Sequence, residues 1–250
     1  MVTSRRDSMA SLFARAFFTT PTLVKLWNAF VARNAELFLS GNLSEDIQAV
    51  VRQSEKRTSI SDHLLTLYAE ATEVKPMVTV ELGTGGGDST LVLLRAAERC
   101  SGTLVSVDVD DCSDVVRSDR WVFVRSDDVE FGRNWSNWAR TRGLHQMIDL
   151  LFIDTSHQYD HTCAEIRAWF PNLGPQAKVI FHDTNLNAFN RYRDGFVSVG
   201  WNNQRGVIRA IEDYLGVRID ERKALCAVIG DWLIRHDPIC NGLTVLRRLA

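Results

Sequence analysis

Apolar residues recur at two different spacings along the chain, and the change of spacing divides it into two parts. Over residues 8–39 they recur at helical spacing, and Pro21 interrupts the run, so two helices are predicted there. Further helices are predicted just after Ser44 and over residues 59–73. Beyond these, short apolar runs alternate with helical segments.

Five short apolar runs predict strands. They cover residues 77–83, 103–109, 121–126, 148–154 and 178–183. Alternation of strands with helices indicates a parallel sheet covered on both faces, so the predicted class is α/β. Two later runs flank Asn241 and Gly242, a hairpin signal, and predict an antiparallel pair at one edge of the sheet.

Composition excludes several classes of protein. A chain of 250 residues favours one large domain. The formal net charge of -2 gives no indication of a nucleic-acid partner, and no apolar run approaches the roughly 20 residues that span a bilayer. The five cysteines are scattered without a CxxC pair, which favours reduced thiols in a cytoplasmic protein. Arg15 interrupts the first apolar stretch, so we interpret the start as mature protein rather than a targeting peptide.

The glycine-rich stretch VTVELGTGGGDST, residues 78–90, predicts a strand followed by a nucleotide-binding turn. The dinucleotide pattern G-x-G-x-x-G fails, because Asp88 stands where the third glycine should be. An acid at that helix start would also repel a pyrophosphate. The stretch fits acid-x-Gly-x-Gly-x-Gly instead, with Glu81, Gly83, Gly85 and Gly87.

In this register the chain resembles class I S-adenosylmethionine-dependent methyltransferases. The resemblance implies a Rossmann-like, seven-stranded, mostly parallel sheet of order 3-2-1-4-5-7-6, with helices on both faces and here an N-terminal helical extension. Residues 1–58 would form a helical cap or an oligomerisation segment that supports a homo-oligomer. Residues 59–250 would form the methyltransferase domain.

The resemblance also implies a set of cofactor-binding residues. Glu81 would serve the ammonium end of S-adenosylmethionine or its structured water. Asp108, 25 residues after Gly83, would accept both ribose hydroxyls, although the same acid would serve NAD. Asp127 would take the adenine amino group, whereas Asp128 is interpreted as a helix N-terminal charge. The full set is Glu81, Gly83, Thr84, Gly85, Ser89, Asp108, Val109, Ser126, Asp127 and Asp154.

A second motif, within residues 150–185, is more specific. It is similar to metal-assisted O-methyltransferases of macrolide sugars and rhamnose, and to cephalosporin-hydroxylase-like proteins. The matching residues are Asp154, His157, Tyr159, Glu165 and Asp183. The resemblance implies a small-molecule hydroxyl acceptor of the sugar or natural-product type.

Asp154 and Asp183 follow the fourth and fifth strands, which are neighbours about 4.8 Å apart in this sheet order. Two carboxylates so close repel unless a proton or a cation lies between them, and oxygen ligands suit Mg²⁺ or Mn²⁺. For a third ligand we favour Asn185, because strand alternation predicts that His182 points to the opposite face.

His157 is the candidate catalytic base, together with Asp154, because a histidine accepts a hydroxyl proton near neutral pH. His161 is interpreted as a polar surface residue. Residues 185–206 show little periodicity, which is typical of a functional loop. Their aromatic residues fit a lid over the acceptor: Phe189, Tyr192, Phe196 and Trp201.

Three alternatives stay open at this point. The first is a metal-free N- or O-methyltransferase in which the acids only orient the acceptor. The second is a cofactor-binding partner subunit without catalysis, which the intact Asp154, His157 and Asp183 disfavour. An NAD-linked oxidoreductase is the most distant.

Overall fold

The structure, a computed structural model, describes residues 44–249. The helices expected within residues 8–39, and the oligomerisation role given to them, lie outside this part of the chain. The helices are α3 (Glu45–Ser54), α4 (Leu64–Val74) after a 3-10 turn (Ser61–His63), α5 (Asp88–Cys100), α6 (Asp128–Thr141), α7 (Tyr159–Trp169) followed by a 3-10 turn (Phe170–Asn172), and α8 (Gly206–Leu215).

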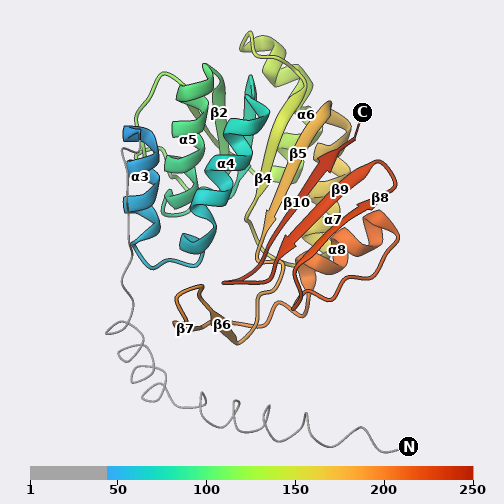
Figure 1. The fold of residues 1–250 in the computed structure, drawn as a ribbon. Helices are drawn as coiled ribbons and strands as arrows, with labels where there is room; N and C mark the ends of the chain where they lie inside the picture. The colour runs from blue at the N-terminus through green and yellow to red at the C-terminus, as the bar shows by residue number, and fades with distance from the viewer. Residues whose placement is uncertain (1–43, 250) are drawn as a thin grey trace, which may run out of the picture.

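One large sheet runs through the molecule (Figure 1). Its strands are β1 (Val78–Leu82), β2 (Thr103–Asp108), β3 (Trp121–Arg125), β4 (Ile148–Ile153), β5 (Leu173–His182), β8 (Leu225–Ile229), β9 (Trp232–Asp237) and β10 (Leu243–Arg248). Their order is β3-β2-β1-β4-β5-β10-β9-β8. The first five are parallel, and the last three add in antiparallel fashion, so the expected mostly parallel sheet is confirmed.

The sheet has eight strands, so the expected number of seven is wrong by one. The first seven positions keep the expected order 3-2-1-4-5-7-6, and β8 is added beyond β9 at the edge. A two-residue turn at Gly230 and Asp231 joins β8 to β9, and Gly230 has a φ of +54° there. This Gly-Asp pair is a hairpin signal that the sequence analysis did not use.

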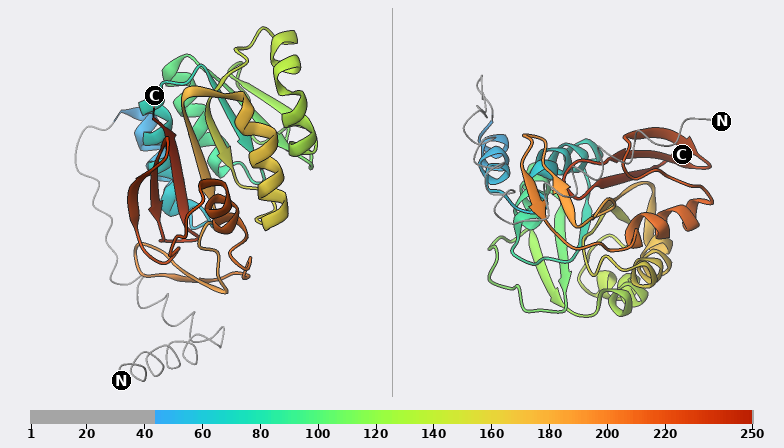
Figure 2. Two further views of the ribbon diagram at one scale, coloured as in Figure 1. Left: turned by 90° about the vertical axis from the view of Figure 1, so that its right-hand side faces the viewer. Right: turned by 90° about the horizontal axis from the view of Figure 1, so that it is seen from below.

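Helices cover both faces of the sheet, with α3, α4 and α5 on one face and α6, α7 and α8 on the other (Figures 1 and 2). Each face has its own core, because strand side chains alternate. In β4, Leu150 and Phe152 pack with α4 and α5, while Leu151 and Ile153 pack toward α6 and α7. α3 joins the first core through Val50.

Residues 185–206, expected to lack regular structure, contain a small hairpin. Its strands are β6 (Phe189–Arg191) and β7 (Val197–Val199), which form a separate two-stranded sheet below the C-terminal edge of the parallel strands (Figure 1). No helix in the described part of the chain is both long and apolar enough to cross a bilayer.

Candidate active site

The glycine turn after β1 brings two distant parts of the sequence into contact. Gly83 has a φ of +84°, and a Cβ there would lie 2.0 Å from the carbonyl oxygen of Asp154. The backbone N–H of Asp154 in turn donates to Leu82 O. Only glycine permits this approach, so the turn after β1 and the loop after β4 are held against each other.

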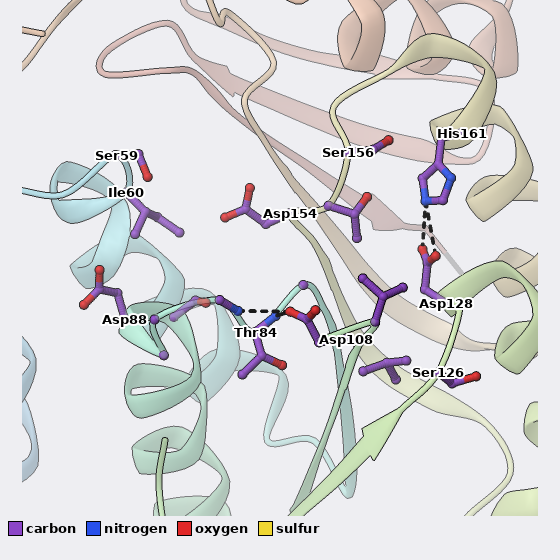
Figure 3. Close-up of a pocket in the computed structure, with 18 of the residues that line it drawn as sticks. Ser59, Ile60, Thr84, Asp88, Asp108, Ser126, Asp128, Asp154, Ser156 and His161 are labelled. Atoms are coloured by element: carbon purple, nitrogen blue, oxygen red, sulfur yellow. Dashed lines mark hydrogen bonds and ion pairs between the residues drawn. The ribbon is translucent and has the colours of Figure 1, made fainter. Parts of the chain in front are cut away.

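Asp108, at the end of β2, holds the glycine turn in place. Its Oδ2 accepts the backbone N–H groups of Thr84 at 2.8 Å and Gly85 at 3.1 Å, and its Oδ1 accepts the N–H of Asp110 at 2.9 Å. Burial would raise the pKa of Asp108, but these backbone donors outweigh it and lower the pKa. The carboxylate is therefore a fixed anion at the centre of the cavity wall (Figure 3).

A cavity of about 480 Å³ opens over this turn. Nine of the ten residues expected to bind the cofactor line it: Gly83, Thr84, Gly85, Ser89, Asp108, Val109, Ser126, Asp127 and Asp154. In Figure 3 they surround one space, with Asp88 and Ser59 at one end and Ser126, Asp128 and His161 at the other. Ser59 and Ile60 come from the segment before α4, far away in sequence, and carry no motif that could have predicted them.

Glu81 is the expected cofactor residue that does not line the cavity. Its carboxylate is fully buried and accepts three hydroxyl groups, from Ser89 at 2.6 Å, Thr90 at 2.8 Å and Ser106 at 2.6 Å. Burial raises the pKa of Glu81 to about 7 despite these donors. The alternation of side chains along β1 turns Glu81 inward, where its hydrogen bonds tie β1 to α5 and β2.

At the far end of the cavity, the two acids after β3 both line the wall but have different partners. Asp127 is the N-cap of α6, and its Oδ1 accepts the N–H of Glu130 at 2.8 Å. Asp128 is buried and pairs with His161, whose Nε2 lies 3.2 Å from Asp128 Oδ1. His161, interpreted from the sequence as a surface residue, therefore lies in the cavity wall (Figure 3).

Glu165 lies behind this pair. It is fully buried, and the hydroxyl of Thr155 donates to its Oε1 at 2.6 Å. Burial and the neighbouring Asp128 raise the pKa of Glu165 well above its ordinary value. A protonated Glu165 allows Asp128 to remain ionised opposite His161. Asp128 and His161 thus line one end of the cavity, with Glu165 buried behind them.

The second acidic site lies where β4 and β5 end. Asp154 and Asp183 converge there as expected, and His157 lies between them, with its Nε2 3.0 Å from Asp154 Oδ1 and 3.0 Å from Asp183 Oδ2. His157 has a φ of +57°, in the left-handed region that a non-glycine residue rarely adopts. A strained backbone at such a position is typical of functional sites.

The expected orientation of His182 is wrong. Its Nδ1 lies 3.1 Å from Asp154 Oδ1 and 3.2 Å from Asp183 Oδ1, so it faces the same site as Asp183. The strand ends at His182, and Asp183 takes a φ of +56°, which breaks the alternation of side chains. Alternation could not have predicted this reversal.

Asn185 is directed away from the acids. Its amide donates to Pro238 O at 2.8 Å, and its Oδ1 accepts the amide of Asn187. Two groups of side chains in the described chain have ligand atoms within 4.8 Å of one another: Asp128, His161 and Glu165 form one, and Asp154, His182 and Asp183 form the group at these strand ends. Within the described chain, His182 thus takes the place in this group that we expected for Asn185.

Charge neutralisation dominates this cluster. Burial alone would raise the pKa of Asp154, but the two imidazoles lower it well below its ordinary value. Burial alone would lower the pKa of His157, but hydrogen bonds to Asp154 and Asp183 raise it to about 10. The acids likewise raise the pKa of His182. At neutral pH the imidazolium of His157 therefore offsets the charge of the two carboxylates.

The donor set suits a divalent cation. Two carboxylates and an imidazole nitrogen lie together, and the cluster is largely closed to solvent. Asp183 Oδ1 is buried and accepts no hydrogen bond from residues 44–249. Oxygen ligands alone favour Mg²⁺, and the added imidazole shifts the preference toward Mn²⁺ or a similar ion.

Comparisons with known proteins agree with this arrangement. Residues 80–184 match the family model described as a methyltransferase domain. No curated protein sequence matches the chain. Among solved structures, the SAH-bound methyltransferase PaMTH1 of Podospora anserina is similar, with 11% identity, a TM-score of 0.53, and coverage of 100% of this chain and 99% of that one.

Two further structures are similar. The O-methyltransferase TomG of Streptomyces achromogenes, in complex with SAM, is 15% identical with a TM-score of 0.53, over 90% of this chain and 98% of that one. The MycE methyltransferase of the mycinamycin biosynthetic pathway, in complex with Mg and SAH, is 19% identical with a TM-score of 0.51, over 84% of this chain and 56% of that one. At these identities the likeness establishes the fold.

Proposed function

We propose that the protein is an S-adenosylmethionine-dependent methyltransferase that methylates a hydroxyl group of a small molecule with the assistance of a divalent cation; the match of residues 80–184 to a methyltransferase-domain model supports the class. The observation that carries the proposal is the contact between Gly83 and the carbonyl of Asp154. It holds the expected cofactor turn directly beside the paired acids, so a bound cofactor and an acceptor at the acids would be neighbours.

The cofactor would occupy the cavity over the glycine turn. Asp108 is the acid placed to accept the ribose hydroxyls, because its carboxylate already lies fixed in the wall beside Thr84 and Gly85. Asp128 and His161, together with the capping residue Asp127, would form the polar wall at the adenine end. S-adenosylmethionine supplies an electrophilic methyl group, so the protein has to provide alignment and a deprotonated acceptor.

The cation would be held by Asp154, His182 and Asp183. When bound, such a cation lowers the pKa of a hydroxyl that it contacts. A cation at the acids would take over the role of the His157 proton in offsetting the carboxylates, and the neutral imidazole could then take the proton of the acceptor hydroxyl. Asp154 would orient His157 as well as bind the cation.

A metal-free methyltransferase is the second candidate, and one observation favours it. The Nε2 of His157 lies 3.0 Å from both carboxylates, which is sufficient to hold them together without a cation. In that case the acids orient the acceptor, and a neutral His157 would still be required as the base. Residues 1–58 would serve either candidate as a cap or as the surface of a homo-oligomer.

Binding measurements separate these proposals without knowledge of the acceptor. We expect calorimetry to show that the wild-type protein binds S-adenosylhomocysteine, and also binds about one Mn²⁺ ion per chain. Asp183→Asn should abolish Mn²⁺ binding and leave the affinity for S-adenosylhomocysteine nearly unchanged. The matched control is Asp220→Asn, which removes an exposed acid paired with Lys223 and should change neither.

Each outcome has a defined meaning. Absence of S-adenosylhomocysteine binding, with tight binding of NAD, would overturn the proposed function. Binding of S-adenosylhomocysteine without Mn²⁺, together with full methyl transfer in excess chelator, would leave the metal-free candidate standing.

A further inference from the structure

The four aromatic residues of the segment 185–206 have different surroundings. Tyr192 is buried, and its hydroxyl donates to Thr58 O at 3.0 Å. The guanidinium of Arg57 lies 3.1 Å from the centroid of the Phe196 ring. These two residues attach the hairpin to the chain that precedes α4. They are therefore anchors, although the sequence predicted all four aromatics as one lid.

Trp201 is placed differently. It is 49% exposed, and its ring centroid lies 6.2 Å from that of His157, at an interplanar angle of 48°. The Nε2 of His157 contacts both carboxylates of the acidic cluster. A large apolar ring thus remains accessible to solvent immediately beside the residue proposed to accept the proton.

The backbone that carries Trp201 is held on both sides. A Cβ at Gly200 would lie 2.9 Å from the amide nitrogen of Asn190, so the chain packs closely against the hairpin at this residue. Two residues after Trp201, the buried Asn203 donates its amide to Asp183 O at 3.1 Å. Trp201 is therefore fixed relative to the acids although its side chain is exposed.

The start of α8 adds a third attachment. A Cβ at Gly206 would lie 2.4 Å from the carbonyl oxygen of His157 and 2.9 Å from the nitrogen of Tyr159. The loop of Trp201 and the loop of His157 are thereby packed backbone to backbone. Exposed side chains are usually mobile and surrounded by polar residues. An exposed tryptophan whose backbone is packed tightly on both sides is typical of a ligand-binding surface.

We propose that Trp201 is the platform on which the methyl acceptor binds, and that the acceptor is a hydroxylated ring whose flat face packs on the indole. Both a planar aromatic ring and the C–H face of a sugar ring have this chemistry. Stacking would present a ring hydroxyl to His157 and the acids. This inference rests on the proposed function and adds the class of substrate and the residue that selects it.

The test uses ligand-observed NMR with the full-length protein, S-adenosylhomocysteine and diamagnetic Mg²⁺, so that binding is measured without turnover. The probes are catechol, a methyl pyranoside, and sorbitol as an acyclic polyol with hydroxyl groups but no ring. At least one ring probe should bind the wild-type protein. Trp201→Ala should weaken that binding by about tenfold or more, whereas Trp201→Phe should stay within about threefold, because a phenyl ring keeps a flat face.

The controls separate stacking from a general structural effect. Val228→Ala truncates another exposed apolar residue, on the remote edge strand β8, and should leave ring binding unchanged. Sorbitol should bind all variants equally weakly. Which of the two ring probes responds to Trp201→Ala tells whether the platform selects an aromatic ring or a sugar ring.

Two results would overturn the inference: ring probes that bind Trp201→Ala as well as they bind the wild type, or the absence of ring binding to the wild type. Failure of the proposed function would look different. In that case S-adenosylhomocysteine or Mn²⁺ would not bind, while the dependence of ring binding on Trp201 would still be measurable without either.

Discussion

Asp108 and Asp154 lie at the ends of β2 and β4, on the two sides of β1, yet different donors hold them. Asp108 accepts three backbone N–H groups from residues close to the glycine turn and just beyond β2. Asp154 is paired with two imidazoles, His157 and His182. Backbone donors do not titrate, whereas imidazoles exchange their protons and compete with cations for the carboxylate.

This difference divides the site into two halves. We call the glycine turn with Asp108 the permanent half, and the cluster of Asp154, His157, His182 and Asp183 the adjustable half. The permanent half keeps its shape over a wide pH range, because backbone N–H groups lower the pKa of Asp108. The adjustable half depends on protons or a cation to offset the charges of two buried carboxylates. The contact of Gly83 with Asp154 joins the halves, so a change at the acids can be tested for its effect on cofactor binding.

The largest effect should come from the adjustable half. His157→Ala should lower turnover by about 10²-fold or more with little change in the affinity for S-adenosylhomocysteine, because a general base acts on the rate. The measurement is steady-state methyl transfer to a ring acceptor found by the NMR test, with calorimetry as control. A variant that keeps most of its turnover would place the base elsewhere.

The pH dependence of the same residue sharpens the comparison. The folded pKa of His157, about 10, lies above its ordinary value of 6.5. Its contribution to the stability of the cation-free protein is therefore fully present below pH 6.5 and is lost as the pH rises toward 10. Saturating Mg²⁺, which is diamagnetic, should lower the pKa of His157, which an NMR titration of the imidazole would detect. An unchanged pKa would show that the cation does not bind at these acids.

In the permanent half, Asp108→Ala should weaken binding of S-adenosylhomocysteine by about 10- to 100-fold, because it removes the proposed acceptor of the ribose hydroxyls and loosens the glycine turn. Calorimetry measures this affinity. Mn²⁺ binding at the other half should stay the same. Loss of Mn²⁺ binding as well would show that the two halves are not separable.

The sequence predicted the permanent half well, because its signals are local. Alternating apolar residues in β1 and the positive-φ turn at Gly83 have few other structural solutions. The adjustable half could be predicted only in outline. The convergence of Asp154 and Asp183 follows from neighbouring strand ends, but the reversal at His182 depends on one left-handed residue that no pattern marks.

The roles of single side chains are likewise hard to predict from the sequence, even where the motif beside them is recognised. Asp127 and Asp128 are adjacent acids, and their roles depend on which of them begins α6 and caps it. Helix boundaries are uncertain by one or two residues from sequence, which is sufficient to exchange the two. Trp201 carries no motif at all, and its position depends on contacts with the distant His157 and Asp183.

Glu81 tests whether the permanent half contains a titrating group after all. Its folded pKa of about 7 lies above the ordinary 4.5, so the folded protein binds the proton more tightly than the unfolded chain. Wild-type stability should therefore fall between pH 4.5 and 7, by up to about 3 kcal/mol from this group. Glu81→Gln should remove that fall in urea-unfolding measurements. An equally steep fall in the variant would assign it to other groups.

The smallest effect should come from substitutions of Asp127. They distinguish a capping role for this residue from the adenine-binding role that the family resemblance implies. Its carboxylate accepts the N–H of Glu130 as the N-cap of α6, so Asp127→Ala should cost about 0.5–2 kcal/mol of stability. Asp127→Ser retains a capping oxygen and should recover most of this loss in the same urea-unfolding experiment. Binding of S-adenosylhomocysteine should change by no more than about twofold in either variant, because Asp127 Oδ1 is engaged in capping while Asp128 and His161 remain in the same end of the cavity wall. Unchanged stability with an affinity weakened by about tenfold would return the adenine contact to Asp127, as the family resemblance predicted.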